Sequence, residues 1–146
     1  ILALIELNSQ GQELIKEVSK IAREKGGKLA LAHVADWGIG LDEDHFTFLT
    51  PKETLTKVNK IVEHKLKEMA KGVDCQVFSC PDENIEKLIL TWQPDLLIAG
   101  HHANHGFKDG EIIHARSEFA HVSAMVRLIN VRKRSFFFPL RIQPQT

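Results

Sequence analysis

Ile1-Leu2-Ala3-Leu4-Ile5-Glu6-Leu7-Asn8-Ser9 opens the chain and decides its fold class. An almost unbroken apolar run that ends in polar residues is typical of a β-strand buried on both faces, as in a parallel sheet. A helical pattern follows at once, with capping-box spacing between Ser9 and Gln12 and a stop at Gly26-Gly27. The opening therefore predicts a buried strand, a helix capped by Ser9, and a return to the sheet.

The same alternation continues to the end of the chain. Hydrophobic periodicity predicts further strands over 29–34, 73–79, 95–100 and 136–140. Thr50-Pro51-Lys52-Glu53 is an excellent start for a second helix, which Gly72 ends, and Pro81 opens a third. A fourth helix is expected from apolar residues at helical spacing: Ala115, Phe119, Val122, Val126 and Ile129.

Strands that alternate with amphipathic helices indicate right-handed crossovers and a parallel sheet covered on both faces. We therefore expect a single α/β domain over residues 1–146, a three-layer doubly wound fold. In such sheets ligands bind at the carboxyl ends of the strands, near the switch in strand order. The candidate ligand or nucleotide site comprises Glu6, Leu7, Asn8, Ser9, Val34, Gly100, His101, His102 and Ala103.

Composition restricts the classes of partner. Lys and Arg number 19 and so do Asp and Glu, so no global field favours nucleic acid or an anionic membrane. The basic run 132–134 lacks interleaved aromatic residues, and a solvated turn or dimer rim is the preferred interpretation. Without an apolar run of bilayer length or a signal peptide, a cytoplasmic protein is expected. Cys75 and Cys80 are too far apart along one strand for a disulfide, so we expect reduced thiols that fill the core.

Several stretches, in order and over nearly the whole chain, resemble the universal stress protein family. They are the opening strand and turn over 1–9, the second strand over 28–34, the fourth strand and glycine exit over 94–102, and the Phe-Phe-Pro-Leu-Arg stretch over 137–141. The resemblance implies a five-stranded parallel sheet of order 3-2-1-4-5, of the adenine nucleotide alpha hydrolase type. It also implies a cytoplasmic stress-response protein that forms a homodimer through its last strand, at Phe136, Phe137, Phe138 and Leu140.

Members of that family divide into ATP binders and non-binders, and this chain is similar to the non-binders. Binders carry a Gly-x2-Gly-x9-Gly-Ser/Thr pattern after the fourth strand, where backbone amides and a helix N-terminus hold the phosphates. Here Gly100 matches the first position, but Ala103 and Ile113-His114 stand at the other two. Glu6 replaces the aspartate of the first strand. No cofactor is therefore expected, although a modified loop at Gly106 and Gly110 leaves ATP binding open.

The expected function is a dimeric stress-response binding or regulatory module without catalysis. The first alternative is a nucleotide-binding switch or slow ATPase that uses Glu6, Val34, Gly100 and the loop after His102 in a modified geometry. The second is a metal site in the histidine loop. We expect instead that the histidines concerned are solvated or hydrogen-bonded: His101, His102, His105, His114 and His121. Ser9, His33 and His101 could meet Glu6 near the strand ends, but no nucleophile elbow supports catalysis. Trp37 and the acidic residues 42–44 could cover the second strand as a lid.

Overall fold

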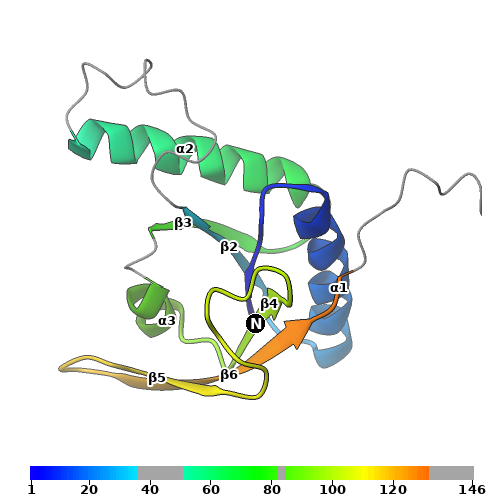
Figure 1. Cartoon of the computed structure of the whole chain (residues 1–146), viewed down its shortest axis with the longest axis vertical. Helices are drawn as coiled ribbons and strands as arrows, with labels where there is room; N and C mark the ends of the chain where they lie inside the picture. Colours follow the sequence, from blue (N-terminus) through cyan, green and yellow to red (C-terminus); the bar gives the residue numbers. More distant parts are fainter. Residues whose placement is uncertain (36–50, 82–84, 132–146) are drawn as a thin grey trace, which may run out of the picture.

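The computed structural model describes residues 1–35, 51–81 and 85–131, which form a six-stranded sheet with three helices (Figure 1). The elements follow in chain order: β1 (Leu2–Leu4), α1 (Ser9–Lys25), β2 (Ala30–Ala35), α2 (Pro51–Met69), β3 (Gln76–Pro81), α3 (Ile85–Trp92), β4 (Leu96–Gly100), β5 (Ile112–Arg116) and β6 (His121–Ile129). The prediction of an α/β chain with alternating strands and helices is confirmed as far as β4. No helix within the described residues is long and apolar enough to cross a bilayer.

The sheet is mixed, with strand order β3-β2-β1-β4-β6-β5. All neighbours are parallel except β5 and β6, which form an antiparallel hairpin at one edge. The predicted five-stranded parallel sheet of order 3-2-1-4-5 is therefore wrong. The strand and dimer surface predicted over 136–140 lie outside the described residues, as do Trp37 and the acidic residues 42–44. The place beside β4 belongs to β6.

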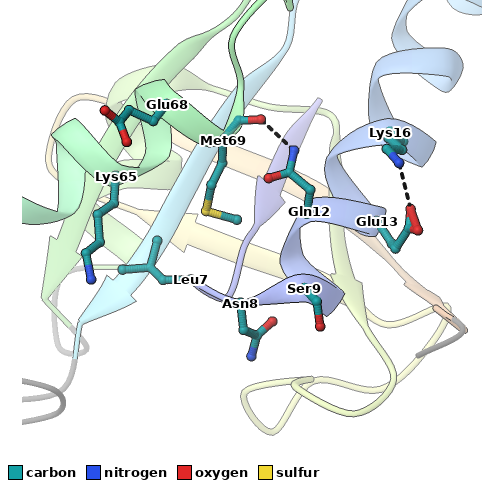
Figure 2. A pocket seen from close by; sticks show the side chains of 9 residues that line it. All are labelled: Leu7, Asn8, Ser9, Gln12, Glu13, Lys16, Lys65, Glu68 and Met69. Carbon is teal, nitrogen blue, oxygen red and sulfur yellow. Dashed lines mark hydrogen bonds and ion pairs between the residues drawn. The ribbon is translucent and has the colours of Figure 1, made fainter. Parts of the chain in front are cut away.

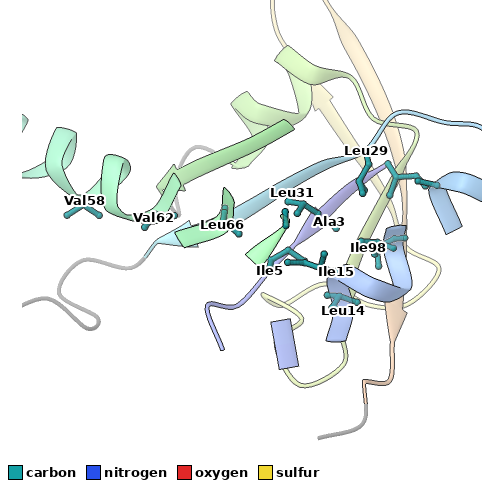
Figure 3. Close-up of a cluster of buried hydrophobic side chains, with 14 residues drawn as sticks. Ala3, Ile5, Leu14, Ile15, Leu29, Leu31, Val58, Val62, Leu66 and Ile98 are labelled. Atoms are coloured by element: carbon teal, nitrogen blue, oxygen red, sulfur yellow. The ribbon is translucent and has the colours of Figure 1, made fainter. Parts of the chain in front are cut away.

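Helices cover the sheet on both faces, as the opening sequence predicts. Ala3 of β1 and Ile5, which directly follows the strand, join a core cluster with Leu14 and Ile15 of α1 and with Leu66 of α2 (Figure 3). Leu2 and Leu4 point to the other face and pack in a cluster with Ile89 of α3. Leu2, Ala3, Leu4 and Ile5 are each at most 2% exposed, so β1 and the residue after it are buried on both faces.

The helix ends follow local sequence signals, with one exception. Gly26 ends α1 in the left-handed conformation at φ 67°, and Pro51 is the first residue of α2. At the start of α1, however, the cap is Asn8 and not the predicted Ser9. The Asn8 side-chain oxygen accepts a hydrogen bond from the backbone N–H of Gly11 at 2.9 Å.

The predicted fourth helix is also wrong, because residues 112–129 form the β5–β6 hairpin. Along β6, Val122, Ala124 and Val126 are buried, whereas the alternating residues His121, Ser123, Met125 and Arg127 are exposed. A buried residue at every second position is the period of a strand. The Ser117 hydroxyl closes the turn by accepting hydrogen bonds from the backbone N–H groups of Phe119 and Ala120.

A matched pair of substitutions distinguishes the hairpin from a helix. Ala124 is fully buried in β6, yet it lies off the apolar stripe that a helix would bury. We expect Ala124→Asp to lower the free energy of unfolding by about 3 kcal/mol or more, because it buries an unpaired carboxylate. Ser123→Asp, one position along on the exposed face, should change it by less than about 1 kcal/mol. Denaturant titration of both variants measures this, and equal effects would contradict the hairpin.

Candidate functional site

The carboxyl ends of β1 and β4 meet at the switch in strand order. The chain leaves β1 toward β2 on one side, whereas β4 lies against β1 on the other. Ligand sites of open α/β sheets form where neighbouring connections diverge in this way. Here the two exits are Glu6–Ser9 after β1 and His101–Ala103 after β4, so the predicted site residues on these two segments lie at one edge of the sheet.

Gly11 brings the start of α1 against the end of β1. A Cβ atom at this position would overlap with the carbonyl oxygen of Glu6, so the close packing requires glycine. The Asn8 side chain spans the same turn from Glu6 to Gly11. This turn fixes the direction in which the Glu6 side chain leaves the sheet.

Glu6, Asn8 and His102 form a polar cluster between the two strand exits. One carboxylate oxygen of Glu6 accepts a hydrogen bond from the Asn8 amide at 2.9 Å and lies 3.3 Å from His102 Nε2. The side chains of His102 and Glu6 are 27% and 31% exposed, so solvent screens their attraction and we assign it no more than about 1 kcal/mol. The cluster thus links the β1 and β4 exits without burying a charge.

The β4 exit does not fit the phosphate site of the ATP-binding pattern. A Cβ atom on Gly100 would lie 2.6 Å from Cε1 of His102, so the imidazole ring occupies the space above this glycine. Residues 101–111 run directly into β5, and no helix begins after β4 within the described residues. In the ATP-binding glycine pattern, backbone N–H groups at a helix N-terminus bind the phosphates. The described residues after β4 contain no such helix N-terminus.

A groove opens beside this cluster, between the start of α1 and the end of α2 (Figure 2). It has a volume of about 470 Å³, which lies within the range of small-molecule sites. Gln12 joins the two helices by donating a hydrogen bond to the carbonyl oxygen of Met69 at 2.7 Å. The lining residues are Leu7, Asn8, Ser9, Gln12, Glu13, Lys16, Lys65, Glu68 and Met69.

The groove lining carries two lysines and two glutamates. Lys16 lies 3.4 Å from Glu13, and Glu68 lies 3.3 Å from His64. Lys65 extends beside Leu7 in Figure 2, and no dashed line joins it to either of the two carboxylates drawn there. The groove wall therefore combines apolar surface from Leu7 and Met69 with one ammonium group that a ligand could neutralise.

The other predicted site residues have separate surroundings. Val34 packs with the cluster on the α3 face, and Ala103 closes a turn by donating its N–H to the carbonyl oxygen of Gly100. His101 is exposed, with its backbone N–H bound to Ile129. The β4 exit thus contributes His102 to the cluster, and not His101.

The residues considered for catalysis do not converge. The Nδ1 atom of His33 lies 2.8 Å from the carbonyl oxygen of Ile5, and Glu6 contacts Asn8 and His102. Within the described ranges, no histidine or carboxylate contacts the Ser9 hydroxyl. No three His, Cys, Asp or Glu side chains come together there as a metal site.

Sequence patterns did not indicate the groove or the role of Gly11. Gly11 has no turn signal around it, because its contact with Glu6 is a matter of packing. Gln12 and Met69 are separated by 57 positions, so their hydrogen bond depends on how two helices dock. Lys65 follows an ordinary charged stripe on α2. To predict this groove from the sequence, one would need to know that α1 and α2 pack on the same face of the sheet.

Substitution of Gly11 tests the packing that holds the site. In an isolated helix, Gly→Ala would be stabilising by about 1 kcal/mol. Here we expect Gly11→Ala to lower the free energy of unfolding by about 3 kcal/mol or more, because the new methyl group overlaps with the Glu6 carbonyl. Gly27→Ala is the control, since nothing lies within 4 Å of its added Cβ. A stabilised Gly11→Ala variant in thermal or denaturant unfolding would contradict the contact.

Cys75 offers a test based on its pKa. Burial and the nearby charge of Asp74 raise the pKa of the Cys75 thiol, so less thiolate is present at neutral pH. In a Cys80→Ala background, we expect iodoacetamide to alkylate Cys75 more slowly than a free model thiol at pH 7.5. Asp74→Asn should increase the rate, because it removes the smaller of the two causes. A rate equal to or above that of the model thiol would show that Cys75 is a reactive cysteine.

In comparisons with known proteins, no protein-family model matches this chain and no curated protein matches it. What the site does must therefore be inferred from its own residues.

Proposed function

We propose that this chain is a non-catalytic regulatory module that binds a small organic anion in the groove between α1 and α2. The resemblance to universal stress proteins supplies the proposed setting, which is a cytoplasmic stress response. The observation that carries the proposal is the groove itself, where Lys65 stands beside Leu7 and Met69. A ligand with one anionic group and an apolar body matches this combination.

The geometry of the groove supports such a ligand in three ways. Its volume accommodates a small molecule, and its floor carries donors and acceptors from Asn8, Ser9 and Gln12. Lys16 is paired with Glu13, and the carboxylates of Glu13 and Glu68 on the groove wall would repel a second anionic group. A ligand with a single negative charge is therefore favoured over a polyphosphate.

The groove also offers a path from binding to regulation. Its floor is the turn that holds Asn8, and Asn8 contacts Glu6, which in turn contacts His102 at the β4 exit. A ligand that engages Asn8 would compete with the Glu6 carboxylate for the Asn8 amide. This competition would change the contacts between the two strand exits without any covalent step.

A nucleotide-binding switch is the second candidate. Its support is the placement of Glu6 and the α1 N-terminus at the switch in strand order, where doubly wound sheets bind nucleotides. Against it stand the His102 ring above Gly100 and the continuation of the chain into β5.

Fluorescence titration with 8-anilinonaphthalene-1-sulfonate, an apolar monoanion, tests the proposal. We expect saturable binding of one probe molecule to the native chain. Lys65→Glu should weaken it at least about fivefold, because one charge attraction near the surface contributes on the order of 1 kcal/mol. Lys67→Glu is the matched control: it makes the same charge change on the same helix, but Lys67 lines a different hollow.

Three results would decide against the anion groove. Binding that is absent, or that weakens equally in the two variants, would exclude Lys65 as the anion contact. Micromolar binding of Mg-ATP in calorimetry, retained by Lys65→Glu and lost on Gly100→Val, would establish the nucleotide switch instead. Circular dichroism of each variant ensures that the probe reports on folded protein.

A further inference from the structure

β5 is an edge strand whose outer side has no neighbour among the described strands. It stands at the end of the strand order, and its one described partner is β6. The register with β6 is continuous from Ile112 to Arg116, so no bulge interrupts it. Natural proteins commonly block an edge strand with proline, a bulge or several charged side chains. Arg116 is the one residue of β5 that carries a fixed charge, so this edge can accept another strand.

The hydrogen bonds of the hairpin show which backbone groups of β5 point outward. The N–H of Ser117 donates to the carbonyl oxygen of Ala120, and the N–H of Val126 donates to the carbonyl oxygen of Glu111. The odd-numbered positions at both ends of β5 therefore face β6. In an antiparallel ladder, the residues between them turn their backbone groups to the other side. The outward groups belong to Ile112, His114 and Arg116.

The side chains along this edge leave room for a second strand. Ile112 is 45% exposed, on the face of the hairpin away from α3. The His114 ring contacts its own subunit, because its Nδ1 atom lies 3.0 Å from the Ser123 hydroxyl and 3.4 Å from His121 Nε2, both on β6. The ring therefore leans inward, toward β6. Ile113 faces the other way and packs against the cluster beneath α3.

We propose that two copies of this chain pair their β5 strands antiparallel about a two-fold axis at His114. In this register all three outward-facing residues of one copy stand opposite outward-facing residues of the other, so their backbone groups can form hydrogen bonds across the axis. Ile112 lies opposite the partner's Arg116, and His114 lies opposite the partner's His114. The contact is isologous, because the same strand supplies both of its sides.

The residues that meet in this register favour a second copy as the occupant. Ile112 lies beside the aliphatic part of the partner's Arg116, whose guanidinium group extends into solvent. On the α3 face, Ile113 lies opposite the partner's Ala115, so the apolar layer continues across the axis. The two copies of Arg116 are about 13 Å apart at 3.3 Å per residue, so their charges do not face each other directly. This dimer uses β5, and not the strand over 136–140 that the family resemblance implies.

Sedimentation velocity of the full, untagged chain tests the dimer. Paired five-residue strands form a small interface, so we expect a reversible dimer that increases with protein concentration. Ile112→Lys should weaken it at least about tenfold, because a lysine then faces the partner's Arg116 twice across the axis. Met125→Lys is the matched control, since it adds the same charge to the same face one strand inward and should keep the dimer.

A second substitution tests the register by rescue. Ile112→Lys combined with Arg116→Glu should restore the dimer, because each lysine then faces a glutamate of the partner. The rescue requires that position 112 lie opposite position 116 of the other copy. A variant that was merely misfolded would not recover in this way.

Single cysteines measure the same register directly. In a Cys75→Ala, Cys80→Ala background, His114→Cys places two thiols opposite each other, with Cα atoms about 5.5 Å apart and within disulfide reach. We expect a disulfide-linked dimer under mild oxidation. Arg116→Cys is the control, because its two copies would lie about 13 Å apart, which is beyond that reach.

Each of the following results would overturn the proposal. A chain that stays monomeric at every concentration does not associate through β5. A dimer that Ile112→Lys leaves intact forms through another surface, such as the strand predicted over 136–140. Equal weakening by Ile112→Lys and Met125→Lys, no rescue by Arg116→Glu, or disulfide formation no faster in His114→Cys than in Arg116→Cys would exclude the axis at His114. Circular dichroism ensures that each variant compared is folded.

Discussion

The burial of β1 on both faces is the constraint on which the rest of the structure depends. Leu2 and Leu4 require one apolar layer, and Ala3 and Ile5 require another on the opposite side. α1 begins after the short segment 5–8 and packs closely against the end of the strand, where the contact with Glu6 requires glycine at position 11. The direction of Glu6, the cap at Asn8 and the position of the groove all follow from that turn.

The sequence predicted the architecture as far as β4, because there the apolar pattern and the capping residues agree. The choice of Asn8 over Ser9 as the helix cap could not be predicted, since both residue types are good caps; in the structure Asn8 accepts the hydrogen bond from Gly11. The strand ends indicated which residues share an edge of the sheet. They did not indicate that His102 reaches Glu6, because this contact requires the ring to lie over Gly100.

The region after β4 could not be assigned from its pattern. Val122 and Val126 are four positions apart, and this spacing fits one face of a helix as well as one face of a strand. Ala124 decides between them, but a small residue gives a weak signal. The antiparallel hairpin also changes how the chain returns to the sheet. β5 runs back within the plane of the sheet, whereas a helix would have crossed above it, and one face of the hairpin therefore has no cover among the described residues.

This return path has a consequence for the order of folding. The contacts of β5 with β6 join residues close in sequence, so closing them costs little chain entropy and a hairpin of this kind forms within microseconds. By contrast, β1 must find β4 across more than ninety positions. We therefore expect β4 to dock against a two-stranded ribbon that is already formed. The last strand added at this end of the sheet would then be β4 and not β6, which reverses the order of synthesis.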